Sequence, residues 1–109
     1  MSIDAIGYVR SDISGLNQRS DEEQLRHLAK SRGYNLRKTI VFGSHTVDPE
    51  RRLRSVLNRM YTVEAVLVPS AAHFDGGAVP ASISQRAKVV VATPKSVIGQ
   101  LLSTATTIR

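Results

Sequence analysis

The sequence GYVRSD, residues 7–12, ends the first apolar run of the chain. This run, Ile3–Val9, predicts a strand that delivers Arg10 and Ser11 into a loop over Ser11–Gln18. An arginine offers a planar fork of hydrogen-bond donors, and a serine offers a hydroxyl nucleophile. A strand that ends on this pair just before a helix is suited to handling phosphate.

Strand and helix patterns alternate along the chain. Ser20 predicts a helix N-cap because Glu23, three residues on, completes a capping box, and Gly33 ends that helix. Asp48 followed by Pro49 predicts the start of a second helix, over 49–61. The other predicted elements are strands at 36–42, 64–69 and 88–93, a helix of at most two turns from residue 80, and a terminal helix.

This alternation predicts an α/β fold, because parallel strands need crossover connections that are usually helical. We expect three layers, in which a central, mostly parallel four-stranded sheet carries helices on both faces. The chain has 109 residues, enough for one small domain with a single core. We therefore expect a single domain over 1–109, with an α/β core at 3–93 and a C-terminal helix at 94–109.

Composition limits the chemistry and the partners. The chain has no cysteine, and its three histidines lack metal-ligand spacing, so neither a metal nor another cofactor is expected. It shows neither an apolar run of membrane-spanning length nor a signal-peptide pattern, so we expect a soluble, cytoplasmic protein without membrane contact. The formal net charge of +6 favours acidic partners, above all double-stranded DNA bound nonspecifically through its phosphates. The simpler alternative is a solvated basic surface.

The positions of Tyr8, Arg10, Ser20, Gln24 and Leu28 resemble the N-terminal catalytic domain of the serine recombinases, the resolvases and invertases. That family reads Tyr-x-Arg-Val-Ser at the end of a strand and continues into a Ser-x-x-x-Gln-x-x-x-Leu helix. The resemblance covers roughly residues 3–93 and implies a resolvase-like fold. It also implies metal-free DNA strand exchange, in which a serine attacks a phosphodiester and several arginines stabilise the developing charge.

Several positions depart from the catalytic pattern of that family. Without gaps, the nucleophile's position falls on Asp12, and Ser11 stands one residue early. Arg10 matches the first catalytic arginine, whereas the second needs a small gap to fall on Arg51. The family's Leu-Asp-Arg-Leu-Gly-Arg segment corresponds to AAHFDG, residues 71–76, in which His73 replaces one arginine and the last arginine becomes glycine. Each missing transition-state donor costs about 3–4 kcal/mol, so we expect negligible strand cleavage.

The leading hypothesis is therefore a resolvase-like domain without recombinase catalysis. It would act as an accessory or interaction module that forms a homo-oligomer, a dimer, through its C-terminal helix, with weak nonspecific DNA binding. Phosphate contacts would come from Arg10, Arg51, Arg52 and His73. The alternative is recombinase-type strand cleavage in which Ser11 is the nucleophile and Arg10 its catalytic partner. A small anion or nucleotide at the same loops is a further alternative, which no glycine-rich phosphate motif supports.

Overall fold

A computed structural model describes residues 2–92 of the chain. It contains the strands β1 (Ile3–Arg10), β2 (Tyr34–Phe42), β3 (Val63–Val68) and β4 (Lys88–Val91). They form one sheet in the order β2-β1-β3-β4, in which every neighbouring pair is parallel. The predicted α/β class and four-stranded sheet are confirmed. The predicted C-terminal helix over 94–109 lies outside the described residues.

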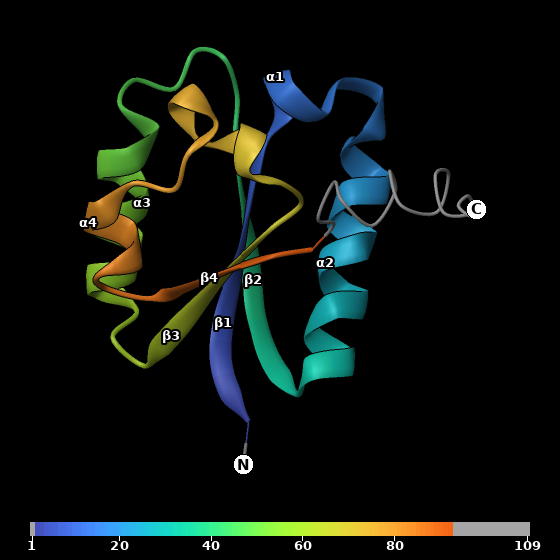
Figure 1. The fold of residues 1–109 in the computed structure, drawn as a ribbon, viewed down its shortest axis with the longest axis vertical. Helices are drawn as coiled ribbons and strands as arrows, with labels where there is room; N and C mark the ends of the chain where they lie inside the picture. Colours follow the sequence, from blue (N-terminus) through green and yellow to red (C-terminus); the bar gives the residue numbers. More distant parts are fainter. Residues whose placement is uncertain (1, 93–109) are drawn as a thin grey trace, which may run out of the picture.

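Helices cover both faces of the sheet, as the three-layer prediction requires (Figure 1). One face carries α2 (Gln18–Arg32), and the other carries α3 (Pro49–Arg59) and the four-residue α4 (Ala81–Ser84). Each face buries its own apolar cluster. The cluster under α2 contains Ala5, Val9, Leu25, Leu28, Ala29, Ala65, Leu67 and Val90. The cluster under α3 and α4 includes Ile6, Tyr8, Leu53, Leu57, Val66, Phe74 and Ile83. Within residues 2–92, no helix is long and apolar enough to cross a lipid bilayer.

Gly7 in β1 allows α2 and β2 to approach the centre of the sheet closely. A Cβ atom at this position would lie 2.8 Å from Thr39 Oγ1 of β2 and 3.0 Å from Leu25 Cδ1 of α2. Contacts under 3.0 Å are too short for carbon against oxygen, so a side chain here would push neighbours apart. Gly7, the first residue of the GYVRSD stretch, therefore allows β2 and α2 to pack closely against β1.

The start of α2 differs from the prediction. The sequence predicts a loop over Ser11–Gln18 and an N-cap at Ser20, whereas the structure has α1 (Ser11–Ser14), a 3-10 turn η1 (Gly15–Asn17), and α2 from Gln18. Ser20 therefore lies inside α2, whose N-cap residue is Asn17. A contact across the turn accounts for the difference: the buried Ser14 Oγ donates to Asp21 Oδ2 at 2.6 Å and ties α1 to the first turns of α2.

The end of the first long helix at Gly33 and the start of the second at Asp48–Pro49 are confirmed, whereas the second helix ends at Arg59 and not at the predicted residue 61. Gly33 ends α2 in the left-handed conformation, with φ of 75°. Asp48 precedes Pro49, and its Oδ1 accepts a hydrogen bond from the backbone N–H of Arg51 at 3.2 Å. The helix after Pro80 is one turn long, within the predicted limit.

Arg86, which follows α4, donates hydrogen bonds to backbone carbonyl groups at and just beyond the carboxyl end of α3. Its Nη2 donates to the carbonyl of Leu57 at 2.8 Å and to that of Met60 at 3.4 Å, and its Nη1 donates to the carbonyl of Val63 at 2.8 Å. The last carbonyls of a helix have no partner within the helix, so a partly buried guanidinium is a favourable cap. This arginine therefore has a structural task that joins α3, β3 and α4.

Candidate functional site

The candidate site lies at the edge of the sheet where the parallel strands end. Residue Arg10 ends β1, Phe42 ends β2, and β3 leads into the 3-10 turns η2 (Ala71–His73) and η3 (Asp75–Gly77). These turns lie at the same end of the molecule as α1 (Figure 1). Ligands of open α/β sheets bind beyond the carboxyl ends of the strands, so this edge is where a site is expected.

Two carboxylates hold the guanidinium of Arg10. Its Nε donates to Asp12 Oδ1 at 3.0 Å and its Nη2 donates to Asp12 Oδ2 at 2.9 Å, which makes a bidentate pair. Its Nη1 donates to Asp75 Oδ1 at 3.1 Å. The Asp12 hydrogen bonds raise the pKa of Arg10, and Arg10 in turn lowers the pKa of the Asp12 carboxyl. The Arg10 side chain is only 13% exposed, so little of the guanidinium faces solvent.

Aromatic side chains fix the segment that carries Asp75. Phe74 stacks on Tyr8 with ring centroids 5.1 Å apart, and Phe42 meets the same tyrosine edge-on at 5.8 Å. Tyr8 is buried, which raises the pKa of its phenol. Because Phe74 is buried beside Asp75, core packing holds the backbone that carries this carboxylate, while the Asp75 side chain itself is 81% exposed.

His73 is buried beneath the same segment, with 2% of its surface exposed. Its Nδ1 accepts a hydrogen bond from the backbone N–H of Arg10 at 2.8 Å. Burial lowers the pKa of His73, although the carboxylate of Asp21 opposes that effect. The lowered pKa favours the neutral imidazole, and an Nδ1 that accepts a hydrogen bond corresponds to the tautomer with its proton on Nε2.

Ser11 points toward β2. Its Oγ donates to the carbonyl of Phe42 at 3.4 Å and lies 3.4 Å from where a Cβ on Gly43 would stand. Within residues 2–92 this is the only hydrogen bond of the Ser11 hydroxyl, whereas the Arg10 guanidinium binds Asp12 and Asp75. The two residues are neighbours in sequence, yet their side chains have different partners.

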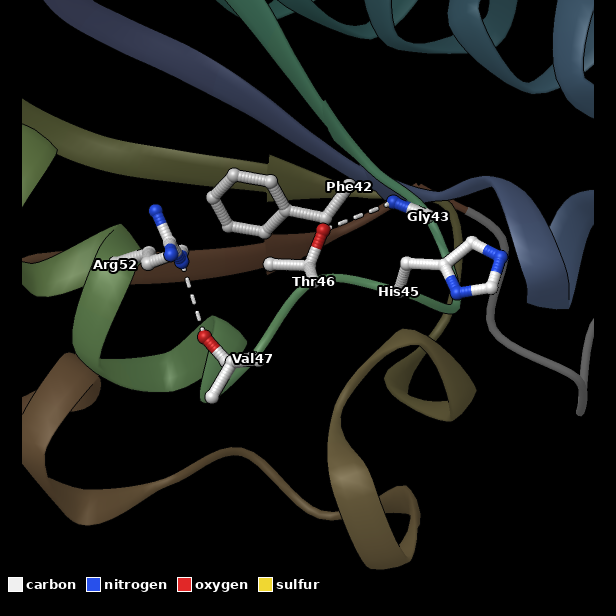
Figure 2. A pocket seen from close by; sticks show the side chains of 6 residues that line it. All are labelled: Phe42, Gly43, His45, Thr46, Val47 and Arg52. Atoms are coloured by element: carbon white, nitrogen blue, oxygen red, sulfur yellow. Dashed lines mark hydrogen bonds between the residues drawn. The ribbon is translucent and has the colours of Figure 1, made fainter.

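Arg51 and Arg52 lie apart from this cluster, at the exposed start of α3. Arg52 Nε donates to the carbonyl of Val47 at 3.0 Å, so the guanidinium is held against the loop that precedes the helix. An open hollow of about 450 Å³ adjoins it (Figure 2). The hollow is lined by Phe42, Gly43, His45, Thr46, Val47 and Arg52.

The structure thus brings together three of the five predicted site residues, Arg10, Ser11 and His73, and places Arg51 and Arg52 on α3. Sequence reasoning missed the hydrogen bond between Ser14 and Asp21. It also missed that the Asp21 carboxylate acts to raise the pKa of His73, against the effect of burial. No local motif marks the pair of Ser14 and Asp21, because it depends on the turn between α1 and α2. Within residues 2–92, no group of three His, Asp or Glu side chains is arranged to hold a metal ion.

Comparisons of the chain with protein-family models, with curated proteins and with solved structures give no match. The relationship to serine recombinases therefore stays a prediction from the sequence.

Proposed function

We propose that this chain is a resolvase-like domain that lacks recombinase catalysis and acts as a self-associating accessory or interaction module. The observation that carries the proposal is the closure of Arg10 by Asp12 and Asp75. A phosphodiester at this position would have to displace a bidentate carboxylate and would be repelled by both acidic groups. Metal-free phosphoryl transfer needs several free cationic donors around the reacting phosphate.

The remaining site residues support the same proposal. Ser11 Oγ donates to a backbone carbonyl, so within residues 2–92 it has no hydrogen bond to a side chain that could act as its general base. The lowered pKa of the buried His73 favours its neutral form, which supplies no positive charge. Among residues 2–92, Arg10 is thus the one cationic side chain at the end of β1, and it already forms ion pairs with Asp12 and Asp75.

Strand cleavage has a direct test. The wild-type chain and Ser11→Ala are incubated with supercoiled and linear duplex DNA and examined for a covalent protein–DNA adduct. We expect no adduct from either protein. An adduct from the wild type that disappears in Ser11→Ala would show that catalysis survives and would overturn this part of the proposal.

Self-association is proposed on the apolar pattern of the C-terminal segment. Val97, Ile98, Leu101, Leu102 and Ala105 repeat at helical spacing, and such a stripe needs an apolar partner surface. Light scattering of the wild type should give the mass of a dimer, and changing both Leu101 and Leu102 to Glu should give a monomer. A monomeric wild type would contradict the proposal.

A second candidate function is weak, nonspecific binding of duplex DNA. It is favoured by four exposed arginines on α3, none of which forms an ion pair within residues 2–92; they are Arg51, Arg52, Arg54 and Arg59. Binding through phosphates should weaken steeply as salt rises. Absence of binding at low salt would eliminate this function.

A further inference from the structure

We propose that the groove between the β2–α3 loop and α3 is the surface that contacts the phosphates of duplex DNA, with Arg52 as its fixed contact and Arg51 beside it. This inference rests on the DNA-binding function proposed above and names the surface responsible. It moves the phosphate contacts away from Arg10 and from the end of β1.

The groove consists of two adjoining hollows. The larger, of about 450 Å³, lies against the loop after β2, and Figure 2 shows Arg52 at one side of it. The smaller, of about 270 Å³, is lined by Val47, Asp48, Arg51, Arg52 and Ser55. Val47 and Arg52 line both, so the two form one depression that runs from the loop onto the first turns of α3.

The charge along this groove is mainly positive. Arg51 and Arg52 line it directly, and Arg54 and Arg59 continue along α3. Both nearby carboxylates are engaged with neutral donors: Asp48 caps the backbone N–H of Arg51, and Glu50 accepts a hydrogen bond from the Ser82 hydroxyl. An anion that approaches α3 therefore meets arginines that have no carboxylate paired with them within residues 2–92.

The exposed face of α2 differs in that one of its lining cations forms an ion pair; carboxylates line both faces, since Asp48 also lines the groove on α3. The two hollows on α2 are lined by carboxylates as well as cations, with Glu22 in one and Glu23 in the other. Arg26, which lines both, lies 3.9 Å from Glu23. This face is a mixed-charge surface, which makes it a matched control for the groove on α3.

Arg52 is held in place before any ligand arrives. Its Nε donates to the carbonyl of Val47, and the loop itself is fixed because the backbone N–H of Gly43 donates to Thr46 Oγ1 at 3.2 Å (Figure 2). Within residues 2–92 the Nη groups of Arg52 have no hydrogen-bond acceptor, so they can donate to a phosphate oxygen. Immobilising a free arginine on binding costs entropy, and a guanidinium already held in one position avoids part of that cost.

Duplex DNA fits this surface better than single strands do. The arginines extend from position 51 to 59, which at 1.5 Å per residue is about 12 Å of helix. Duplex DNA carries one charge for each 1.7 Å or so of its axis, so several phosphates face such a row. Base stacking on single strands needs aromatic platforms, whereas the groove has no Trp or Tyr and offers the half-buried Phe42 beside His45.

The test measures binding of a labelled random-sequence duplex by fluorescence anisotropy over a range of salt. Two double variants are compared with the wild type: Arg51→Gln with Arg52→Gln on α3, and Arg26→Gln with Lys30→Gln on α2. Each removes two positive charges. We expect the α3 variant to lower the slope of log K against log salt by about 0.9 per arginine, and to weaken low-salt binding at least about tenfold. The α2 variant should retain most of the affinity and slope.

Equal losses in the two variants would overturn the groove while leaving DNA binding intact. No binding by the wild type would instead refute the DNA-binding function itself. Circular dichroism of each variant confirms that the fold is kept.

Two further measurements separate this proposal from a general affinity for acids. Arg52→Lys keeps the charge but loses the Nε donor to Val47, so it should retain the salt slope and bind severalfold more weakly. Wild-type affinity in Arg52→Lys would contradict the role of Arg52 as fixed contact.

Poly-glutamate at equal charge concentration should compete poorly with the duplex. Complete competition would show that the groove takes an acidic polypeptide and would overturn DNA as its partner.

Discussion

The backbone N–H of Arg10 donates to the Nδ1 of His73 at 2.8 Å, which joins the last residue of β1 to the turn that follows β3. The side chain of the same arginine binds Asp75, two residues beyond that histidine. One residue thus holds the η2–η3 segment through both its main chain and its guanidinium. The segment thus contacts the end of β1 at the arginine that the sequence predicts to bind phosphate.

The first prediction concerns pH. Burial lowers the pKa of His73, so the folded state binds its proton less readily than the unfolded state does. The stability that this neutral histidine contributes is therefore complete above about pH 6.5, the ordinary pKa of histidine, and is lost as pH falls toward the lowered value. Protonating Nδ1 also removes the acceptor for the Arg10 N–H.

Urea unfolding at several pH values between about 8 and 5 measures this effect. The midpoint should fall as the pH falls below about 6.5, and His73→Gln should remove most of that fall. His27 and His45 remain in both proteins, so their contribution cancels in the comparison. A midpoint in the wild type that is constant, or that rises on acidification, would show that His73 is not held neutral.

The second prediction concerns Arg86. Changing it to Leu removes the donors to the carbonyls of Leu57, Met60 and Val63 and leaves those acceptors partly buried. Hydrogen bonds from charged groups contribute about 1.5–3 kcal/mol, so we expect the free energy of unfolding to fall by about 2–3 kcal/mol. Arg59→Leu removes the same charge from an exposed position of α3 and should change stability by less than about 0.5 kcal/mol. Similar losses in the two variants would contradict the capping role.

The third prediction concerns Gly7. A methyl group here would lie 2.8 Å from Thr39 Oγ1, so Gly7→Ala should destabilise the chain by about 1–3 kcal/mol, the range for overpacked cores. Thr39→Ala removes the nearest atoms and should restore part of the loss in the double variant, because the two sites then couple. Leu25, at 3.0 Å, limits the rescue. Additive losses in chemical denaturation would show that the crowding at Thr39 is not the cause.

Local sequence signals predicted the elements whose ends are set locally. Asp48 before Pro49 and the glycine at position 33 mark helix boundaries through the chemistry of caps, and the structure confirms both. The helix α1 was missed because it is one turn long and is stabilised by Ser14 bonding to Asp21 across a turn. The parallel order β2-β1-β3-β4 likewise depends on contacts between distant segments.

The contacts of Arg10 at the candidate site also differ in how far the sequence predicts them. The bidentate pair of Arg10 with Asp12 joins residues two apart, and the sequence shows both. Asp75 is 65 residues from Arg10, and the segment that carries it is held near the guanidinium by the packing of Phe74 on Tyr8 and by the hydrogen bond from the Arg10 N–H to His73. The structure adds the ion pair through which Asp75 holds the arginine, which the sequence pattern does not predict.

The most direct test of the account asks whether the Arg10 guanidinium accepts a phosphate. The Nε–H resonance of Arg10 is followed by NMR during titration with inorganic phosphate, in the wild type and in Asp12→Asn combined with Asp75→Asn. We predict no saturable shift in the wild type, because both carboxylates hold the guanidinium, and a saturable shift in the double variant. A saturable shift in the wild type would contradict the closure of this site.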